Sequence, residues 1–132
     1  MRITVIDDEA DFAETIAAQL RLAGHDAVTA TDGRRGIELA KASGAEAVIT
    51  DMLMPAMDGI EVIRALRQEL AGLWIVAVSG GSGAVPSSMA LNFSQILGAD
   101  RDLFKPFNTT ELLAALEATP ERHEPCLSKG GS

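Results

Sequence analysis

Apolar residues recur along the chain with two different periods, and the two periods alternate. Short runs of β-branched and aliphatic residues are typical of strands, and they occur at 2–6, 25–31, 45–50, 73–78 and 101–104. Between and after them, apolar residues return every three or four positions, which indicates amphipathic helices; these stretches are 11–23, 33–42, 59–71, 85–97 and 109–118. Five strand–helix units in strict alternation predict a doubly wound α/β fold, a five-stranded parallel sheet with helices on both faces.

Polar residues mark where several of these helices begin. Asp32 and Asp58 each precede a helical stretch, and an aspartate there can accept a hydrogen bond from a free backbone N–H group of the first turn. Asn108 and Glu111 have the spacing of a capping box, in which each side chain bonds the backbone of the other residue. We therefore expect helices to start at these three places.

The composition is that of one acidic globular domain. Of 132 residues 47% are hydrophobic, and 11 basic against 19 acidic residues give a formal net charge of -8. That charge disfavours a polyanion, so we expect no nucleic-acid partner. The single cysteine, Cys126, has no disulfide partner in the chain, and no apolar run approaches the roughly 20 residues that span a bilayer. We expect a cytoplasmic protein with no membrane partner.

The composition changes after Thr119. Residues 120–132 are mostly proline, glycine, serine and charged residues, which is typical of a disordered tail, and the final Gly-Gly-Ser is typical of a cloning remnant. We expect residues 1–119 to form the single domain. The tail is too short to fold as a second domain.

Chemically distinctive residues follow four of the predicted strands. They are Asp7 and Asp8, then Asp51, Ser79 and Lys105. In a parallel sheet the carboxyl ends of the strands share one edge. Three carboxylates gathered there repel one another unless a cation lies among them, and oxygen ligands suit Mg²⁺ or the similar Mn²⁺. With a lysine and a hydroxyl beside them, these residues point to phosphoryl transfer onto a carboxylate.

Four segments resemble the receiver domain of two-component response regulators, in particular its single-domain, chemotaxis-type members. They are Val5-Ile6-Asp7-Asp8-Glu9, the stretch 51–59 with Pro55 and Gly59, Ser79-Gly80, and Leu103-Phe104-Lys105-Pro106-Phe107. Their joint order and spacing are specific, and the match extends from Arg2 to about Ala118. The resemblance implies a flavodoxin-like (βα)5 fold with strand order 2-1-3-4-5.

The resemblance also implies roles for the metal-binding and phosphate-binding residues. Asp51 corresponds to the phosphoacceptor, which takes its phosphoryl group from a histidine kinase, a histidine phosphotransfer protein or a small phosphodonor. Asp8 and Asp51 correspond to direct ligands of Mg²⁺, Asp7 to a ligand through water, and Leu53 to a ligand through its backbone carbonyl.

The remaining site residues correspond to groups that contact the phosphoryl oxygens. Ser79 and Lys105 would each bond one oxygen, and Gly80 would leave room for the phosphate. Pro106 would follow a cis peptide bond that directs Lys105 into the site.

Two features depart from the receiver pattern. Asp102 occupies the position at which receivers carry a tyrosine or phenylalanine that moves with the hydroxyl residue, and the chain has no tyrosine. The stretch 80–99 contains no charged residue although its helix, 85–97, should be exposed on one side. We expect that helix to form the surface for a downstream protein or a homodimer.

Three functions remain open at the level of sequence. The first is a stand-alone response regulator that docks to a protein or acts as a phosphorelay intermediate, catalysing only its own phosphorylation and dephosphorylation. The second is a pseudo-receiver that binds proteins without phosphate turnover, against which the intact site residues argue. The third is an aspartyl-nucleophile phosphatase, which would have Asp-x-Asp-x-Thr where this chain has Met52-Leu53-Met54-Pro55 after Asp51.

Overall fold

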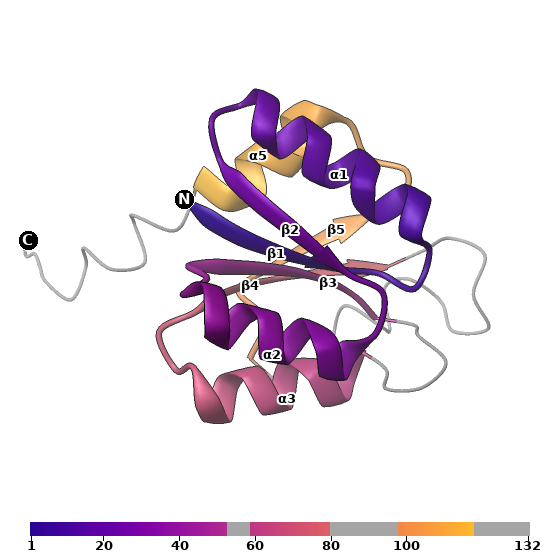
Figure 1. Ribbon diagram of the computed structural model, residues 1–132. Helices are drawn as coiled ribbons and strands as arrows, with labels where there is room; N and C mark the ends of the chain where they lie inside the picture. The colour runs from indigo at the N-terminus through magenta and orange to yellow at the C-terminus, as the bar shows by residue number, and fades with distance from the viewer. Residues whose placement is uncertain (53–58, 80–97, 118–132) are drawn as a thin grey trace, which may run out of the picture.

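The computed structural model describes residues 1–52, 59–79 and 98–117 (Figure 1). The predicted N-cap Asp58, the predicted helix 85–97 and the predicted tail 120–132 lie outside these residues. None of the helices in the described ranges is both long and apolar enough to cross a membrane.

Five parallel strands form one sheet in the order β2-β1-β3-β4-β5. They are β1 (Arg2–Ile6), β2 (Asp26–Ala30), β3 (Ala47–Asp51), β4 (Trp74–Ser79) and β5 (Arg101–Phe104). The predicted flavodoxin-like topology and strand order are therefore confirmed. The order reverses between β1 and β3, and in such sheets the crevice at the reversal is the usual place for a ligand.

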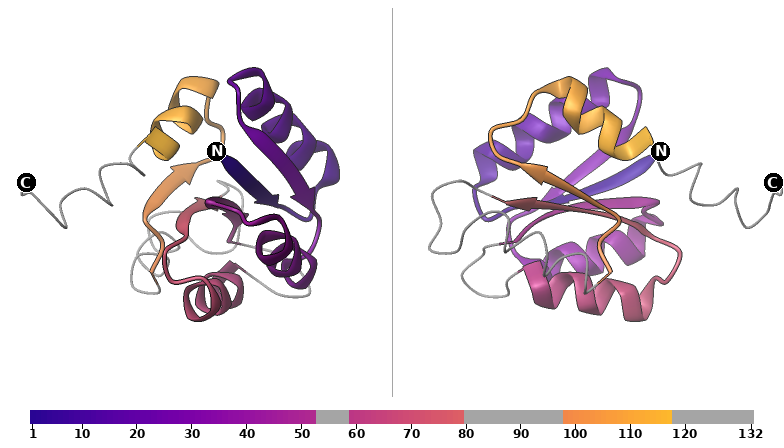
Figure 2. Two further views of the ribbon diagram at one scale, coloured as in Figure 1. Left: turned by 60° about the vertical axis from the view of Figure 1, so that its left-hand side comes forward. Right: turned by 180° about the vertical axis from the view of Figure 1, so that it is seen from behind.

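Two layers of helix enclose the sheet (Figures 1 and 2). The helices are α1 (Ala10–Leu22), α2 (Gly33–Ser43), α3 (Gly59–Glu69) and α5 (Thr109–Glu117). Helices α1 and α5 cover one face, whereas α2 and α3 cover the other. Each face of the sheet is therefore buried, which explains why β3 and β4 are almost continuously apolar.

Alternation along the strands divides the core into two halves. Ile3 and Val5 of β1 pack in the cluster beneath α1 and α5, and Ile6 packs in the cluster beneath α2 and α3. The intervening Thr4 is fully buried, and its hydroxyl has no hydrogen-bond partner within the described residues. An unbonded hydroxyl in an apolar core lowers stability, since it has lost its bonds to water.

The predicted helix starts are confirmed at two of the three places. Asp32 is the N-cap of α2 and accepts a hydrogen bond from the backbone N–H of Arg35 at 2.8 Å. Before α5, the side chain of Asn108 accepts from the backbone N–H of Glu111 at 2.8 Å, and the Glu111 carboxylate accepts from that of Asn108 at 3.0 Å. This reciprocal pair is the expected capping box.

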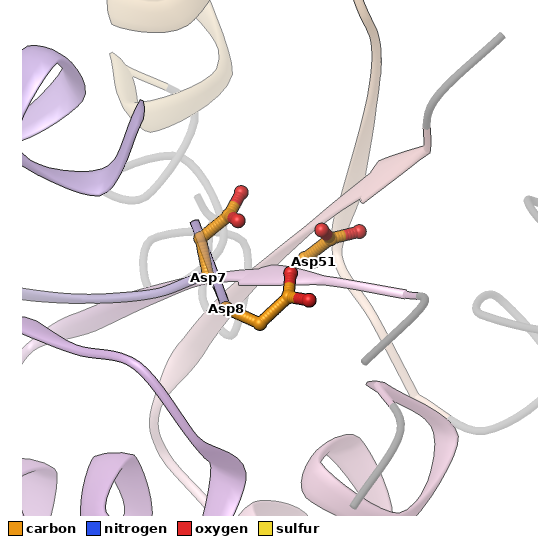
Figure 3. A group of neighbouring side chains, drawn as sticks. All are labelled: Asp7, Asp8 and Asp51. Carbon is orange, nitrogen blue, oxygen red and sulfur yellow. The ribbon is translucent and has the colours of Figure 1, made fainter. Parts of the chain in front are cut away.

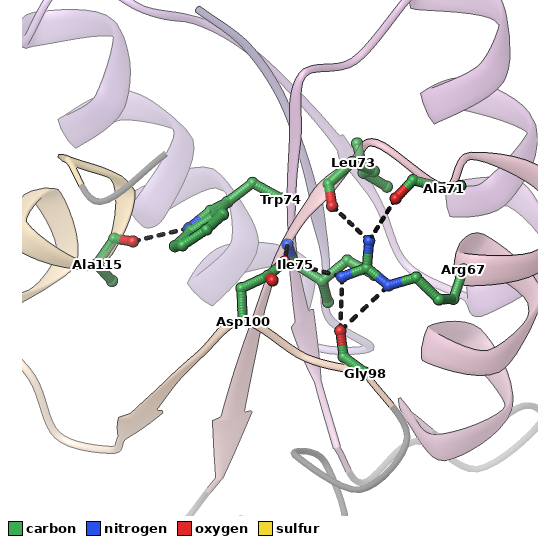
Figure 4. Close-up of polar contacts among 8 residues, drawn as sticks. All are labelled: Arg67, Ala71, Leu73, Trp74, Ile75, Gly98, Asp100 and Ala115. Carbon is green, nitrogen blue, oxygen red and sulfur yellow. Dashed lines mark hydrogen bonds and ion pairs between the residues drawn. The ribbon is translucent and has the colours of Figure 1, made fainter. Parts of the chain in front are cut away.

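A half-buried arginine, Arg67, connects the end of α3 to the amino-terminal ends of β4 and β5 (Figure 4). The Arg67 guanidinium donates to the backbone carbonyls of Ala71 at 2.9 Å, Leu73 at 2.8 Å and Gly98 at 3.2 and 2.5 Å. It also forms an ion pair with the Asp100 carboxylate at 2.8 Å. The same carboxylate oxygen accepts from the Ile75 N–H at 2.8 Å. One side chain thus bonds the connection between α3 and β4 and the segment that leads into β5, at the edge opposite Asp51.

Candidate functional site

The strand register brings the predicted site residues to one edge of the sheet. Ile6 of β1 is paired with Thr50 of β3. The residues that follow them, Asp7 and Asp51, therefore lie side by side where the two strands end. Asp51 is paired with Val78 of β4, and Ser79 is paired with Phe104 of β5 immediately before Lys105. Residues from the beginning, middle and end of the chain therefore meet at the carboxyl edge.

Three carboxylates converge at this edge (Figure 3). One carboxylate oxygen from each of Asp7, Asp8 and Asp51 lies within 4.8 Å of the others. Asp7 and Asp51 are 2% and 6% exposed, whereas Asp8 is exposed. Two of the three negative charges are therefore largely removed from water.

Lys105 supplies the positive charge at the site. Its Nζ lies 3.3 Å from Asp7 Oδ2 and 3.5 Å from Asp51 Oδ2, and its side chain is 21% exposed. The Lys105–Pro106 peptide bond is cis, as expected. The ammonium thus contacts both buried carboxylates.

Burial and neighbouring charges change the proton affinities of these groups. Burial raises the pKa of Asp7, and the negative charge of Asp51 adds to that rise, although the Glu9 N–H and the Lys105 ammonium lower it. Burial lowers the pKa of Lys105, but the charges of Asp51 and Asp7 outweigh burial and raise it above its usual value. Lys105 is therefore held in its charged form.

Neither aspartate after β1 is the N-cap of α1. The N-cap of α1 is Glu9, whose side chain makes no cap hydrogen bond. Asp7 Oδ1 accepts from the Glu9 N–H at 2.9 Å, which fixes the orientation of the carboxylate and leaves Oδ2 facing Lys105. Asp8 extends toward Asp51 (Figure 3). One carboxylate is thus locally anchored while its neighbour is directed to the cluster.

The arrangement fits a small divalent cation. Three carboxylates and one ammonium leave two negative charges in excess at the cluster. In octahedral coordination at about 2.1 Å, ligand oxygens lie roughly 3 to 4 Å apart, and the oxygens of the cluster lie within 4.8 Å of one another. Hard oxygen donors of this number and charge suit Mg²⁺.

The sequence matches the family described as response regulator receiver domain over residues 3–117. The chain belongs to this family. Two-component signalling is therefore its setting, and receiver domains interact with histidine kinases or phosphotransfer proteins and bind Mg²⁺ through an acidic pocket.

Solved structures of other receiver domains share the fold. A response regulator receiver domain protein from Clostridium thermocellum has a TM-score of 0.83 at 24% identity, covering 92% of this chain and 94% of that one. The chemotaxis protein CheY4 of Vibrio cholerae has a TM-score of 0.78 at 27% identity, with 89% and 97% covered. The signal receiver domain of a proposed response regulator, NarL, from Mycobacterium tuberculosis has a TM-score of 0.78 at 30% identity, with 90% and 95% covered.

Other predicted site residues of this receiver domain are placed only in part. Ser79 is the last residue of β4, and its backbone lies at the same edge as Asp51. Leu53 and Gly80 lie outside the described residues. Asp102 lies in β5 opposite Ala77 with a half-buried side chain. The roles of these four residues remain predictions.

Aromatic residues beside Lys105 were not identified from the sequence as part of the site. The Lys105 Nζ lies over the ring of Phe12 at 4.3 Å from its centroid. The ring of Phe107 meets that of Phe12 edge-on, with centroids 6.0 Å apart and an interplanar angle of 74°. Sequence periodicity assigns Phe12 only to the apolar side of its helix, and the placement of Phe107 two residues after Lys105 is the one signal that could have drawn attention to the pair.

Proposed function

We propose that this receiver domain acts in the cytoplasm as a stand-alone response regulator whose phosphoacceptor is Asp51. A histidine kinase or a histidine phosphotransfer protein would supply the phosphoryl group. The phosphorylated domain would dock to a downstream protein or pass the group on as a phosphorelay intermediate. The observation that carries the proposal is the buried Asp51 carboxylate, 3.5 Å from the Lys105 ammonium and beside two further aspartates.

In the proposed transfer the phosphoryl group moves from the donor's phosphohistidine to Asp51 at the carboxyl edge. A carboxylate oxygen of Asp51 attacks the phosphorus of a phosphohistidine, so that an O–P bond forms as the N–P bond breaks. The histidine nitrogen leaves with the electron pair and takes up a proton. Because the phosphoryl group brings its own negative charge, the site must first bring positive charge to that edge.

Lys105 and the acidic cluster would meet this requirement together. The Lys105 ammonium contacts both Asp51 and Asp7, so a short movement would bring it to a phosphoryl oxygen. Asp8 and Asp51 would hold Mg²⁺ directly, Asp7 through water and Leu53 through its carbonyl. When bound, Mg²⁺ offsets negative charge on the phosphoryl oxygens. Ser79 would bond a second phosphoryl oxygen, and Gly80 would leave space for the phosphoryl group.

The proposal is tested by intact mass after incubation with Mg²⁺ and a small phosphodonor such as phosphoramidate. We expect the wild type to gain the mass of one phosphoryl group and Asp51→Asn to gain none. Asp26→Asn, at an exposed position that opens β2, is the matched control and should gain the group as the wild type does.

Other results would contradict the proposal. Metal binding with no mass gain in the wild type would indicate a protein-binding module without phosphate turnover. Continuous hydrolysis of unrelated phosphate esters would indicate a phosphatase. A gain that persists in Asp51→Asn would place the acceptor elsewhere.

A further inference from the structure

The Lys105 ammonium has an aromatic neighbour as well as carboxylate neighbours. Asp7 and Asp51 lie at 3.3 and 3.5 Å from Nζ, and the face of the Phe12 ring lies at 4.3 Å from it. That separation is well inside the limit of about 6 Å at which a cation over an aromatic face is attracted by the ring. The ammonium is therefore held by two kinds of interaction at once.

A ring suits this position for an electrostatic reason. Its face carries partial negative charge that attracts an ammonium, yet the ring adds no net charge. A further carboxylate would hold Lys105 more strongly, but it would also repel the incoming phosphoryl group from an edge that already has three aspartates. Phe12 attracts the cation without that penalty.

The ring of Phe12 is itself held in place by the segment that carries Lys105. Phe107 follows Lys105 by two residues, and its ring packs edge-on against Phe12 with centroids 6.0 Å apart. Both rings are partly buried against the core beneath α1 and α5. The ring that faces the ammonium therefore has little freedom to turn away.

We propose that Phe12 is a positioning residue that holds the Lys105 ammonium at the phosphoacceptor edge in readiness for phosphoryl transfer. This inference rests on the proposed function of Asp51. A lysine side chain has four rotatable bonds, and ordering it has an entropic cost. The Phe12 face imposes much of that order before the phosphodonor arrives, which lowers the barrier to transfer.

Three replacements separate the effect of the ring face from that of packing. Phe12→Leu keeps an apolar side chain but removes the ring. A multiply fluorinated phenylalanine at position 12 keeps the shape and withdraws negative charge from the face. Leu113→Ala is the matched control, since it loosens the same core beneath α1 and α5 at the end that lies beside Met1 and His25, away from Lys105. Urea unfolding of each protein shows which are folded.

The first readout is NMR of the Lys105 side chain, which does not depend on phosphorylation. Protons over a ring face are shifted upfield, so we expect an upfield shift of the Lys105 ε-methylene in the wild type that is lost in Phe12→Leu. The shift should persist in the Leu113→Ala and fluorinated proteins. Without it in the wild type, the contact is absent and the proposal falls.

The second readout is the rate of phosphorylation by phosphoramidate. We expect Phe12→Leu and the fluorinated protein to react about two- to fivefold more slowly than the wild type, as the strength of such contacts implies. Leu113→Ala should react within about twofold of it. Equal rates for the wild type and the fluorinated protein would overturn the positioning role while leaving Asp51 as acceptor. No phosphorylation of the wild type would overturn the proposed function and, with it, this role.

Discussion

Replacing Arg67 by methionine should destabilise the domain far more than its position on a helix suggests. The change keeps an apolar stem of similar length and removes the guanidinium. The carbonyls of Gly98, Ala71 and Leu73 then lose their donor, and Asp100 loses its ion-pair partner. Asp100 would still accept the Ile75 N–H. The substitution therefore removes most of this hydrogen-bond network but not all of it.

The size of the stability loss depends on how many of the groups that lose Arg67 can form hydrogen bonds with water instead. Removing one partner of a fully buried ion pair costs about 3 to 5 kcal/mol. The Arg67 and Asp100 side chains are 22% and 13% exposed, so solvent screens part of the interaction and the exposed Ala71 can rebond to water. We expect about 2 to 4 kcal/mol of lost stability, a large share of the roughly 5 to 15 kcal/mol available to a domain.

Urea unfolding followed by tryptophan fluorescence measures this loss. Trp74 is the only tryptophan in the chain; it is buried, and its indole N–H donates to the Ala115 carbonyl at 2.9 Å (Figure 4). With a denaturant slope of about 2 kcal/mol per molar, the middle of the usual range, the midpoint should fall by roughly 1 to 2 M. Arg64→Met, at an exposed position of the same helix, is the control, with an expected change below about 0.5 kcal/mol. Equal midpoints for the two variants would refute the reasoning.

The remaining predictions concern two buried polar groups. Thr4→Val removes a buried hydroxyl without a partner in the described part of the chain and should stabilise the domain by about 1 kcal/mol in urea unfolding; a loss of stability would show that the hydroxyl is bonded after all. Burial raises the pKa of Asp7 in the folded state, so the folded domain holds the Asp7 proton more tightly than the unfolded chain does. The stability gained in this way is lost as pH rises through the folded-state pKa. Measured with a chelator present, the stability of Asp7→Asn relative to the wild type should therefore increase with pH, whereas parallel pH profiles would contradict the assigned shift.

Local patterns were sufficient to predict the elements that the structure describes and the parallel sheet they form. The apolar run of β3 and the capping box of Asn108 and Glu111 each depend on residues a few positions apart, and both are confirmed. The strand order was implied by the resemblance, and the structure has it. With parallel strands established, the meeting of Asp7, Asp51 and Lys105 at one edge follows from their positions after strands.

Contacts between distant elements could not be predicted in the same way. Helical periodicity groups Phe12 with Ala13 and Ile16, yet those two are fully buried in the core, whereas Phe12 is partly buried and its ring faces Lys105. In the sequence, Arg67 looks like an ordinary charged residue of a surface helix. Its hydrogen bonds and ion pair form only because Gly98 and Asp100 lie close to it in the fold. Such contacts depend on loop paths and side-chain directions that no local period encodes.

The ion pairs of Lys105 imply an order of events during synthesis. Lys105 is 98 residues from Asp7 and 54 residues from Asp51 in the chain. A nascent chain emerges from the ribosome amino terminus first, so β1 and β3 can meet with their aspartates adjacent before the lysine has been made. Until β5 joins the sheet, the ammonium that contacts both aspartates is missing from this edge. The lysine that later serves the site is thus also a counterion that this edge receives after its carboxylates.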